Sequence, residues 1–338
     1  MNYKAKQFLQ YGLSFLLGLA ILYYVFRNED IGQLWQNIKN ANYAWIGVTF
    51  VISMLAHYAR AYRWNLLIKQ TGQTVTNGEA YLALLAGYGA NLVLPRMGEL
   101  TRCAVLKKRQ HVSFDTTLGT VVAERLFDFL CLVFLLIATV IWQYDILFDF
   151  ITSLLSSMVS NQEHVMGLLF VLAALCLLSV TILFLLRKQI IALYNRSQHG
   201  FMLKLRSFAR GLSEGVYSMY QLPNKSSFII SSVFIWVCYY FMAYLIFFAL
   251  PSTSSLSMGA GMAILVMGAF GVAAPVQGGI GAYHWIVSQT LLLYGLNESD
   301  GKTYATLAHG SQMALTIMFS LVSYAIIVLK SPKTDDRT

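Results

Sequence analysis

The sequence predicts an all-α, polytopic integral membrane protein, and three observations predict it. First, 57% of the 338 residues are hydrophobic and only 12% are charged, whereas a soluble domain carries about 25% charged residues. Second, apolar runs as long as a bilayer-spanning helix recur along the chain. Third, Lys and Arg gather in alternate connecting segments, as they do in cytoplasmic loops. We therefore attribute the net charge of +9 to loop bias and expect no nucleic-acid partner.

Six apolar runs are each long enough for one full transmembrane helix. They cover residues 7–26, 43–67, 115–142, 164–186, 228–250 and 304–329. The first run follows Lys4 and Lys6, as in a signal peptide, but it lacks a small-residue cleavage site and is interpreted as an uncleaved span. The four cysteines form no C-x-x-C pair, so we expect neither a disulfide framework nor a metal site.

Two further apolar regions, about 78–109 and 257–295, are interrupted by proline and glycine. Proline removes a backbone donor, and glycine permits unusual dihedral angles. Non-helical backbone at membrane depth is tolerated only inside protein or beside a wet cavity. We therefore predict two re-entrant hairpins. Their structural breaks are Pro95, Gly98, Pro275, Gly278, Gly279 and Gly281.

The loop charges predict how these segments are oriented. If the two hairpins enter from opposite faces, only Arg27, Lys39 and Lys302 of the assigned basic residues lie outside. If residues 78–95 instead crossed the membrane fully, the loop 187–225, with seven Lys or Arg and one Glu, would lie outside. That placement would break the rule that basic loops are cytoplasmic. We therefore predict oppositely oriented hairpins and two cytoplasmic termini. Ordinary loops between full spans remain the alternative, and an inverted repeat is a hypothesis.

Two segments are predicted to lie at the membrane surface. In 198–222, apolar residues recur every three or four positions and basic residues occupy other faces. This pattern predicts an amphipathic helix on the inner leaflet, with a plain cytoplasmic linker helix as the alternative. A shorter outer segment places Ile31, Leu34, Trp35 and Ile38 on one face.

Ionisable residues within spans are functional candidates by default. They form three groups: Arg96, Glu99 and Arg102 after the first break; Glu124, Arg125 and Asp128 in the run 115–142; and His57, Arg60 and Arg63 in the run 43–67.

The spacing of these residues predicts which of them pair. Glu124 and Asp128 are four apart and share a helix face, so both need cations nearby. Arg96 and Arg102 are the expected partners, because the preceding hairpin must pack close. Arg125 is expected to face elsewhere or to extend toward the membrane surface, and Arg63 to extend toward the inner surface.

Two interpretations of the charged groups stay open, and they can coexist. One is a structural ion-pair network that anchors the hairpin. The other is a polar cavity with surplus cation, suited to a phosphate headgroup, because arginine matches phosphate bidentately. A sparser polar set in the outer half comprises Gln277, His284 and His309, for which a structural role is the alternative.

The sequence lacks the catalytic and nucleotide-binding motifs that we sought. There is no H-E-x-x-H, G-x-S-x-G or Walker loop, and "GYGANL" and "GGIGAYHW" both miss the dinucleotide pattern. We therefore expect no enzyme activity, no catalytic residue and no cofactor. The paired acids Glu124 and Asp128 keep a membrane-embedded enzyme as an alternative.

The stretch "NLVLPRMGELTRCAVLKKRQHVSFDTTLGTVVAERLFDFL" resembles the signature region of the lysylphosphatidylglycerol synthase transmembrane, or flippase-like, family. That family typically shows Pro-x-x-Gly-Glu-x-x-Arg, a basic patch and a span with Glu-Arg-x-x-Asp. The matching positions are Pro95, Gly98, Glu99, Arg102, Glu124, Arg125 and Asp128. "PVQGGIGAYHW" is similar to the second glycine motif, but two residues separate Pro275 from the glycines, and His284 stands where Glu is usual.

The resemblance covers about residues 10–330 and implies a single transmembrane flippase-like domain over 1–338. It implies movement of an anionic or aminoacylated phospholipid, or of a polyprenyl-phosphate-linked lipid, in the cytoplasmic membrane of a bacterium. In larger relatives a soluble aminoacyl transferase follows this domain, and we expect none here. A non-transporting scaffold for a separate lipid- or glycan-modifying enzyme is the second hypothesis. Membrane lipids are the expected partners, and the oligomeric state is left open.

Overall fold

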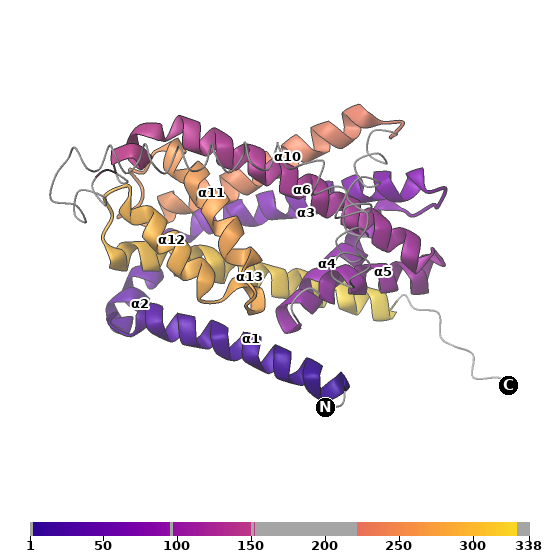
Figure 1. The fold of residues 1–338 in the computed structure, drawn as a ribbon, viewed down its shortest axis with the longest axis horizontal. Helices are drawn as coiled ribbons and strands as arrows, with labels where there is room; N and C mark the ends of the chain where they lie inside the picture. Colours follow the sequence, from indigo (N-terminus) through magenta and orange to yellow (C-terminus); the bar gives the residue numbers. More distant parts are fainter. Residues whose placement is uncertain (1–2, 95–96, 150–151, 153–221, 330–338) are drawn as a thin grey trace, which may run out of the picture.

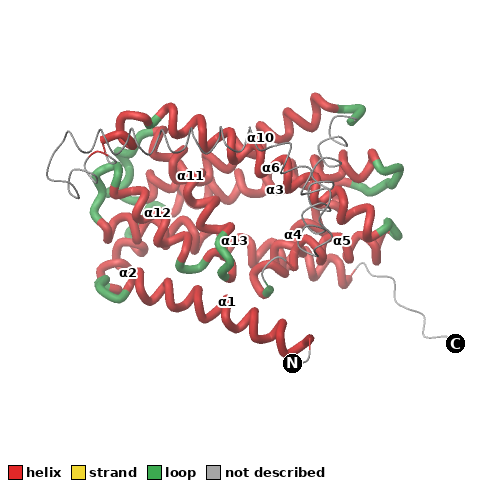
Figure 2. Tube along the Cα trace, viewed as in Figure 1, coloured by secondary structure: helices red, strands yellow, loops and turns green. Residues whose placement is uncertain are grey.

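The computed structural model describes residues 3–94, 97–149, 152 and 222–329. Within these ranges the regular elements are all helices, which confirms the all-α class (Figures 1 and 2). In chain order they are α1 (Tyr3–Phe26), α2 (Ile31–Lys39), α3 (Tyr43–Gln70), α4 (Asn77–Val93), α5 (Met97–Gln110), α6 (Phe114–Trp142), α10 (Lys225–Leu245), η1 (Ile246–Ala249), α11 (Met258–Ala273), η2 (Gln277–Gly279), α12 (Ala282–Leu292) and α13 (Glu298–Leu329).

Three of these helices are long and apolar enough to cross a membrane. They are α6, α10 with its continuation η1, and α13, with mean hydropathies of 2.2, 2.0 and 2.0. Helices α1 and α3 occupy the predicted runs 7–26 and 43–67, but α3 carries charged residues in its C-terminal half. The protein is therefore polytopic. The predicted span 164–186 and residues 198–221 of the predicted surface helix lie outside the described residues.

The first predicted hairpin is formed by α4 and α5, which pack against each other at glycine contacts. A Cβ atom on Gly98 would collide with the carbonyl oxygen of Gly87, so the two backbones touch. The Gly98 amide donates to the Asn91 side chain at 2.6 Å, which ties the start of α5 to α4. Of the predicted break residues, Pro95 lies outside the described part of the chain, as does Arg96.

The second predicted hairpin is formed by α11 and α12, and its break needs glycine. Gly278, Gly279 and Gly281 have φ angles of 61°, 77° and 81°, a region that side chains with a Cβ rarely enter. A Cβ on Gly271 would lie 2.7 Å from the Tyr283 backbone, so α11 and α12 also approach closely.

The two hairpins lie toward opposite ends of α13 and meet at their tips (Figure 1). Gln277 Nε2 donates to the Leu92 and Val93 carbonyl oxygens at 2.8 and 2.5 Å. These carbonyls end α4 and have no partner within the helix, so the amide satisfies them. The contact agrees with oppositely oriented hairpins, while their depth in a bilayer stays a prediction.

Helix α3 packs against α10, α4 and α6. Its C-terminal half is buried through small and large apolar side chains such as Ala61, Trp64 and Ile68. Because α3 is enclosed on several sides, the polar side chains on it face protein rather than lipid. This placement sets up the charged site described below.

The short outer segment forms the predicted helix, α2, which Asp30 caps by accepting from the Gln33 amide. Leu34 is buried and Ile38 packs against the core, whereas Ile31 and Trp35 are more than half exposed. One face of α2 therefore packs on the protein. Contact of its exposed side chains with the membrane interface stays a prediction.

Substitution Gly98→Ala should destabilise the first hairpin, because the added Cβ collides with a backbone carbonyl that cannot rotate away. We expect the free energy of unfolding to fall by about 1–3 kcal/mol. Gly78→Ala is the matched control, since nothing lies within 4 Å of its Cβ position on the same hairpin. Unfolding midpoints in detergent would test this, and equal midpoints for the two variants would contradict the packing described.

Candidate functional site

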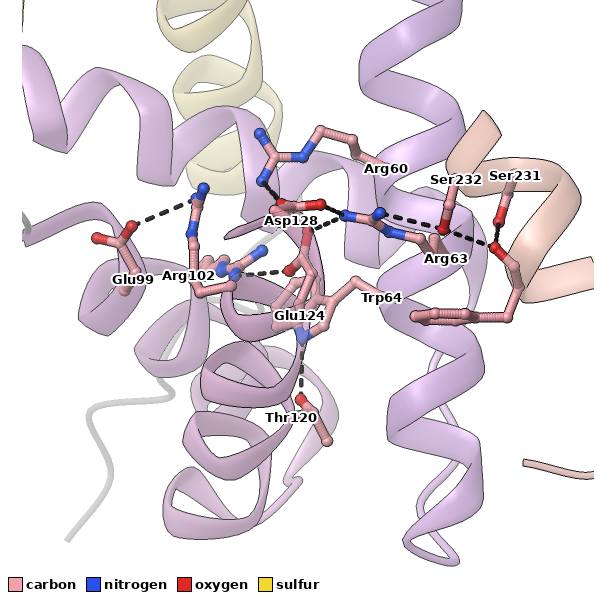
Figure 3. Close-up of polar contacts among 12 residues, drawn as sticks. Arg60, Arg63, Trp64, Glu99, Arg102, Thr120, Glu124, Asp128, Ser231 and Ser232 are labelled. Carbon is pink, nitrogen blue, oxygen red and sulfur yellow. Dashed lines mark hydrogen bonds and ion pairs between the residues drawn. The ribbon is translucent and has the colours of Figure 1, made fainter. Parts of the chain in front are cut away.

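Glu124 of α6 is completely buried and forms ion pairs with three guanidinium groups (Figure 3). Arg102 Nη2 of α5 lies 2.8 Å from Oε2. Arg60 Nη2 and Arg63 Nη2 of α3 lie 3.2 and 3.3 Å from Oε1. The prediction that Arg102 pairs with an acid of this span is therefore confirmed in geometry.

Asp128 lies one helical turn after Glu124 and faces the same side, as predicted. Its partners are different from those expected, however. Arg63 Nη2 lies 2.6 Å from Oδ1, and Arg60 Nη2 lies 3.6 Å from Oδ2. Within the described residues the two cations come from α3 and not from Arg102 of the hairpin, because α3 packs directly on α6.

The expectation that Arg63 extends to the inner surface is wrong. Its side chain is completely buried, and Nη1 donates to Ser232 Oγ of α10 at 3.2 Å. The rings of Phe127 and Phe228 lie within 6.0 Å of its Cζ. Two acids, the Ser232 hydroxyl and two aromatic rings surround the buried guanidinium, and these contacts compensate for the loss of water around it.

Arg125 forms the more exposed edge of the site, since its side chain is 42% exposed. It faces away from Glu124, as expected, but it does not lack a partner. Its Nη2 lies 3.3 Å from Oε1 of Glu99 on α5. This is the most exposed ion pair of the network, because the two side chains are 42% and 25% exposed.

The described part of this arginine–carboxylate network carries one surplus positive charge. Four arginines face three carboxylates across α3, α5 and α6. The members are Arg60, Arg63, Arg102, Arg125, Glu99, Glu124 and Asp128. Arg96, the further arginine that the sequence proposes, lies outside the described residues.

Aromatic side chains hold the arginines in place. Arg102 Cζ lies 4.5 Å from the Trp64 ring centroid, and the indole Nε1 donates to Thr120 Oγ1 at 3.0 Å (Figure 3). Arg60 lies over the Tyr88 ring at 5.6 Å and donates from Nη1 to the Tyr239 hydroxyl at 3.3 Å. These contacts orient the guanidinium planes and exclude water.

Several buried donors of the network have no hydrogen-bond acceptor among the described residues. They are Nε of Arg60, Arg63 and Arg102, Nη1 of Arg102 and the hydroxyl of Tyr88. Arg102 Nη2 and Glu124 Oε2 make no hydrogen bond but form an ion pair with each other, and Glu99 Oε2 is a buried acceptor without a hydrogen bond. A buried polar group without a partner costs about 1–3 kcal/mol. The site is thus rich in donors beyond what its carboxylates use.

The sequence interpretation missed Trp64, Tyr88, Ser232 and Tyr239, which contact the network. Trp64 and Tyr88 lie in apolar runs where aromatic residues ordinarily form core. Ser232 and Tyr239 are on α10, which is distant in sequence from the charged motifs. No spacing rule connects such positions, so only packing identifies them.

The second predicted polar set is separate from the network. His309 Nε2 lies 2.9 Å from the Gly278 carbonyl oxygen, and the His284 ring lies 5.1 Å from the His309 ring. Gln277 is occupied in joining the hairpin tips. These residues therefore support the second hairpin, and within the described ranges no His, Cys, Asp or Glu side chains gather as a metal site requires.

Comparison with known proteins identifies a family over most of the chain. Residues 11–320 match the family described as the lysylphosphatidylglycerol synthase TM region. The UPF0104 membrane protein MJ1595 of Methanocaldococcus jannaschii is 28% identical over 119 residues, which cover 34% of either chain. The alignment thus spans about a third of that relative's length. No solved structure matches this chain significantly.

Substitution Glu124→Gln should destabilise the protein strongly, because three buried guanidinium groups lose their shared carboxylate. Breaking a buried pair costs about 3–5 kcal/mol. Glu298→Gln is the control, since that carboxylate is 57% exposed and Lys302 keeps Glu29 as a partner. Chemical unfolding in mixed micelles would measure both, and a similar small effect for the two variants would contradict a buried network.

Proposed function

Because the chain belongs to the family of the lysylphosphatidylglycerol synthase TM region, we propose that it moves lipids with an anionic phosphate headgroup between membrane leaflets. The substrate class comprises anionic or aminoacylated phospholipids and polyprenyl-phosphate-linked lipids. The arginine–carboxylate network holds the phosphate during transfer. The observation that carries this proposal is the surplus of buried arginine donors over carboxylate acceptors.

The charge balance supports a phosphate ligand. A structural network that only anchored the hairpin would be most stable when its charges cancel, since buried uncompensated charge is costly. Here four arginines face three acids in the described residues. One phosphate would neutralise the surplus, and guanidinium groups hold phosphate oxygens bidentately.

The distribution of unpartnered donors supports the same ligand. Arg102 offers Nε and Nη1, and Arg60 offers Nε beside the Tyr88 hydroxyl. A phosphate has several acceptor oxygens and can satisfy donors that come from α3, α4 and α5 at once. Glu99, Glu124 and Asp128 would orient the arginines, and they could also receive the cationic group of an aminoacylated lipid.

The exposed edge of the network suggests how a headgroup reaches it. Arg102, Arg63 and Glu124 are at most 2% exposed, whereas Asp128 and Arg125 are 20% and 42% exposed. The weak Arg125–Glu99 pair is therefore the part that a headgroup would displace first. Access to Arg102 then requires the first hairpin to move relative to α6.

The two facing hairpins support alternating access. Broken helices that meet near the centre of a transporter are a frequent setting for its substrate site. Here the Gln277 amide joins the second hairpin to the end of α4. In this proposal, the hydrogen bonds at the tips break and reform as the hairpins move during the transfer of one lipid.

Arg102→Gln should slow the movement of a fluorescent phosphatidylglycerol in proteoliposomes about tenfold or more. Loss of a charge-assisted hydrogen bond to phosphate costs about 1.5–3 kcal/mol, and 1.4 kcal/mol is a factor of ten. Arg109→Gln is the matched control. Arg109 is on the same helix and pairs with Glu79 at 2.6 Å, outside the network, so lipid movement should be unchanged.

Two outcomes of this assay would contradict the proposal. If phosphatidylglycerol, its aminoacylated form and polyprenyl phosphate all stay in their leaflets with the unaltered protein, a scaffold for a lipid- or glycan-modifying enzyme becomes the better function. If transport occurs but Arg102→Gln leaves it intact, the network is structural.

Asp128→Asn should strengthen binding of an anionic lipid, because it raises the surplus charge of the described network by one unit without removing an arginine. We expect about a two- to fivefold lower dissociation constant for phosphatidylglycerol, the effect of a partly exposed charge. Lipid titration of the purified protein would measure it. Unchanged or weaker binding would show that the phosphate does not contact this part of the network.

We also propose that the protein resides in the cytoplasmic membrane of a bacterium with both termini inside. The loop charges support this orientation. In a background without the native cysteines, a cysteine at Lys107 should react with an impermeant maleimide only from the cytoplasmic side, and one at Gly295 only from outside. Labelling at Lys107 from outside in intact cells would overturn the orientation of the first hairpin.

A further inference from the structure

Helix α1 lies beside α12 at the side of the bundle (Figure 1), and an apolar groove lies between them. It measures about 490 Å³, a volume within the range of about 300–1,000 Å³ for small-molecule sites. Its lining exposes only apolar surface. The lining residues are Ala20, Ile21, Tyr24, Ala282, Trp285 and Ile286.

The groove results from the way α1 meets the second hairpin. A Cβ on Gly281 would lie 2.7 Å from the Gly18 carbonyl oxygen, so the two backbones touch at this point. Beside this contact, Ala20 and Ala282 have short side chains, and Tyr24 and Trp285 stand at the groove with 59% and 49% of their surface exposed. Small residues flanked by two large rings leave a lateral slot.

Arg27 supplies a positive charge at the end of α1 beside this slot. Its Cζ lies 4.6 Å from the centroid of the Tyr24 ring, which lines the groove. The neighbouring acids are engaged elsewhere, since Glu29 pairs with Lys302 at 2.7 Å and Asp30 caps α2. Among the ion pairs of the described residues, Arg27 takes part in none.

We propose that this groove binds one anionic glycerophospholipid, with an acyl chain in the slot and the phosphate at Arg27. Apolar walls suit the chain, the cation suits the phosphate, and Tyr24 and Trp285 are of the type that lies at the headgroup level. This site is separate from the arginine–carboxylate network and does not depend on lipid transport.

A lipid fits the groove better than a second copy of the chain does. In a two-fold contact centred on the groove, each surface meets its own counterpart. Arg27 of one copy would then approach Arg27 of the other, and like charges repel. An anionic lipid has the opposite charge at the matching position.

The test uses the full chain in phosphatidylcholine vesicles that contain dibrominated phosphatidylglycerol or dibrominated phosphatidylcholine. Bromine quenches the fluorescence of nearby tryptophan side chains. The quenching at Trp285 is obtained by subtracting the quenching of the Trp285→Phe variant from that of the unaltered chain. We expect phosphatidylglycerol to bind about two- to fivefold better than phosphatidylcholine at this position, the effect of one exposed ion pair. Arg27→Gln should lower the ratio of phosphatidylglycerol binding to phosphatidylcholine binding at Trp285 to about one, while quenching by the brominated phosphatidylcholine stays unchanged.

Lys39→Gln is the matched control, because Lys39 also lies over an exposed ring, that of Trp35, at 5.6 Å but away from the groove. It should leave the ratio unchanged. The proposal is overturned if the unaltered chain shows no preference, or if Lys39→Gln lowers the ratio as much as Arg27→Gln. It is also overturned if neither lipid quenches Trp285 and a cysteine at Ile286 cross-links two copies, since a second chain would then fill the groove.

Discussion

The Glu124 carboxylate is the interaction on which the rest of this structure depends. It is buried in α6 and brings together guanidinium groups from α3 and α5. A buried carboxylate is costly unless it is fully compensated, so α3 and α5 have little freedom in where they pack. The position of the first hairpin follows from this, because α5 is its second arm and Arg102 its buried anchor. The same constraint explains why α3 carries arginines yet packs against α10, α4 and α6.

Backbone contacts then determine how the hairpins are built. Gly87 and Gly98 let α4 touch α5, and Gly281 lets the second hairpin touch α1. The Gln277 amide joins the two tips by satisfying carbonyls at the end of α4. Ion pairs hold the first hairpin in place, and close glycine contacts shape both hairpins. The contact between the tips consists of hydrogen bonds. The charged centre is thus held by buried ion pairs, whereas the junction of the two tips is held by hydrogen bonds.

The two lipid sites that we propose use the same chemistry in different surroundings. In the network, arginine is buried, and its excess donors would receive a phosphate after the Arg125–Glu99 pair opens. At the groove, Arg27 is exposed and the apolar slot would hold an acyl chain. The lipid proposed for the groove has its own phosphate position at Arg27, so the two sites would bind different lipid molecules.

Much of the architecture could be predicted from the sequence, since apolar length, proline, glycine and loop charge are local properties. They predicted the all-α class, the positions of five helices in the predicted runs, the helix breaks between α4 and α5 and between α11 and α12, and the shared face of Glu124 and Asp128; that the two helix pairs re-enter the membrane stays a prediction. The partners of those acids could not be predicted from spacing. Arg63 was expected at the surface and is completely buried, and Asp128 pairs with two arginines of α3 that the spacing did not indicate. Only the tertiary structure decided these pairs and the tip contact of Gln277, because they join helices far apart in sequence, where packing and not periodicity chooses the neighbour.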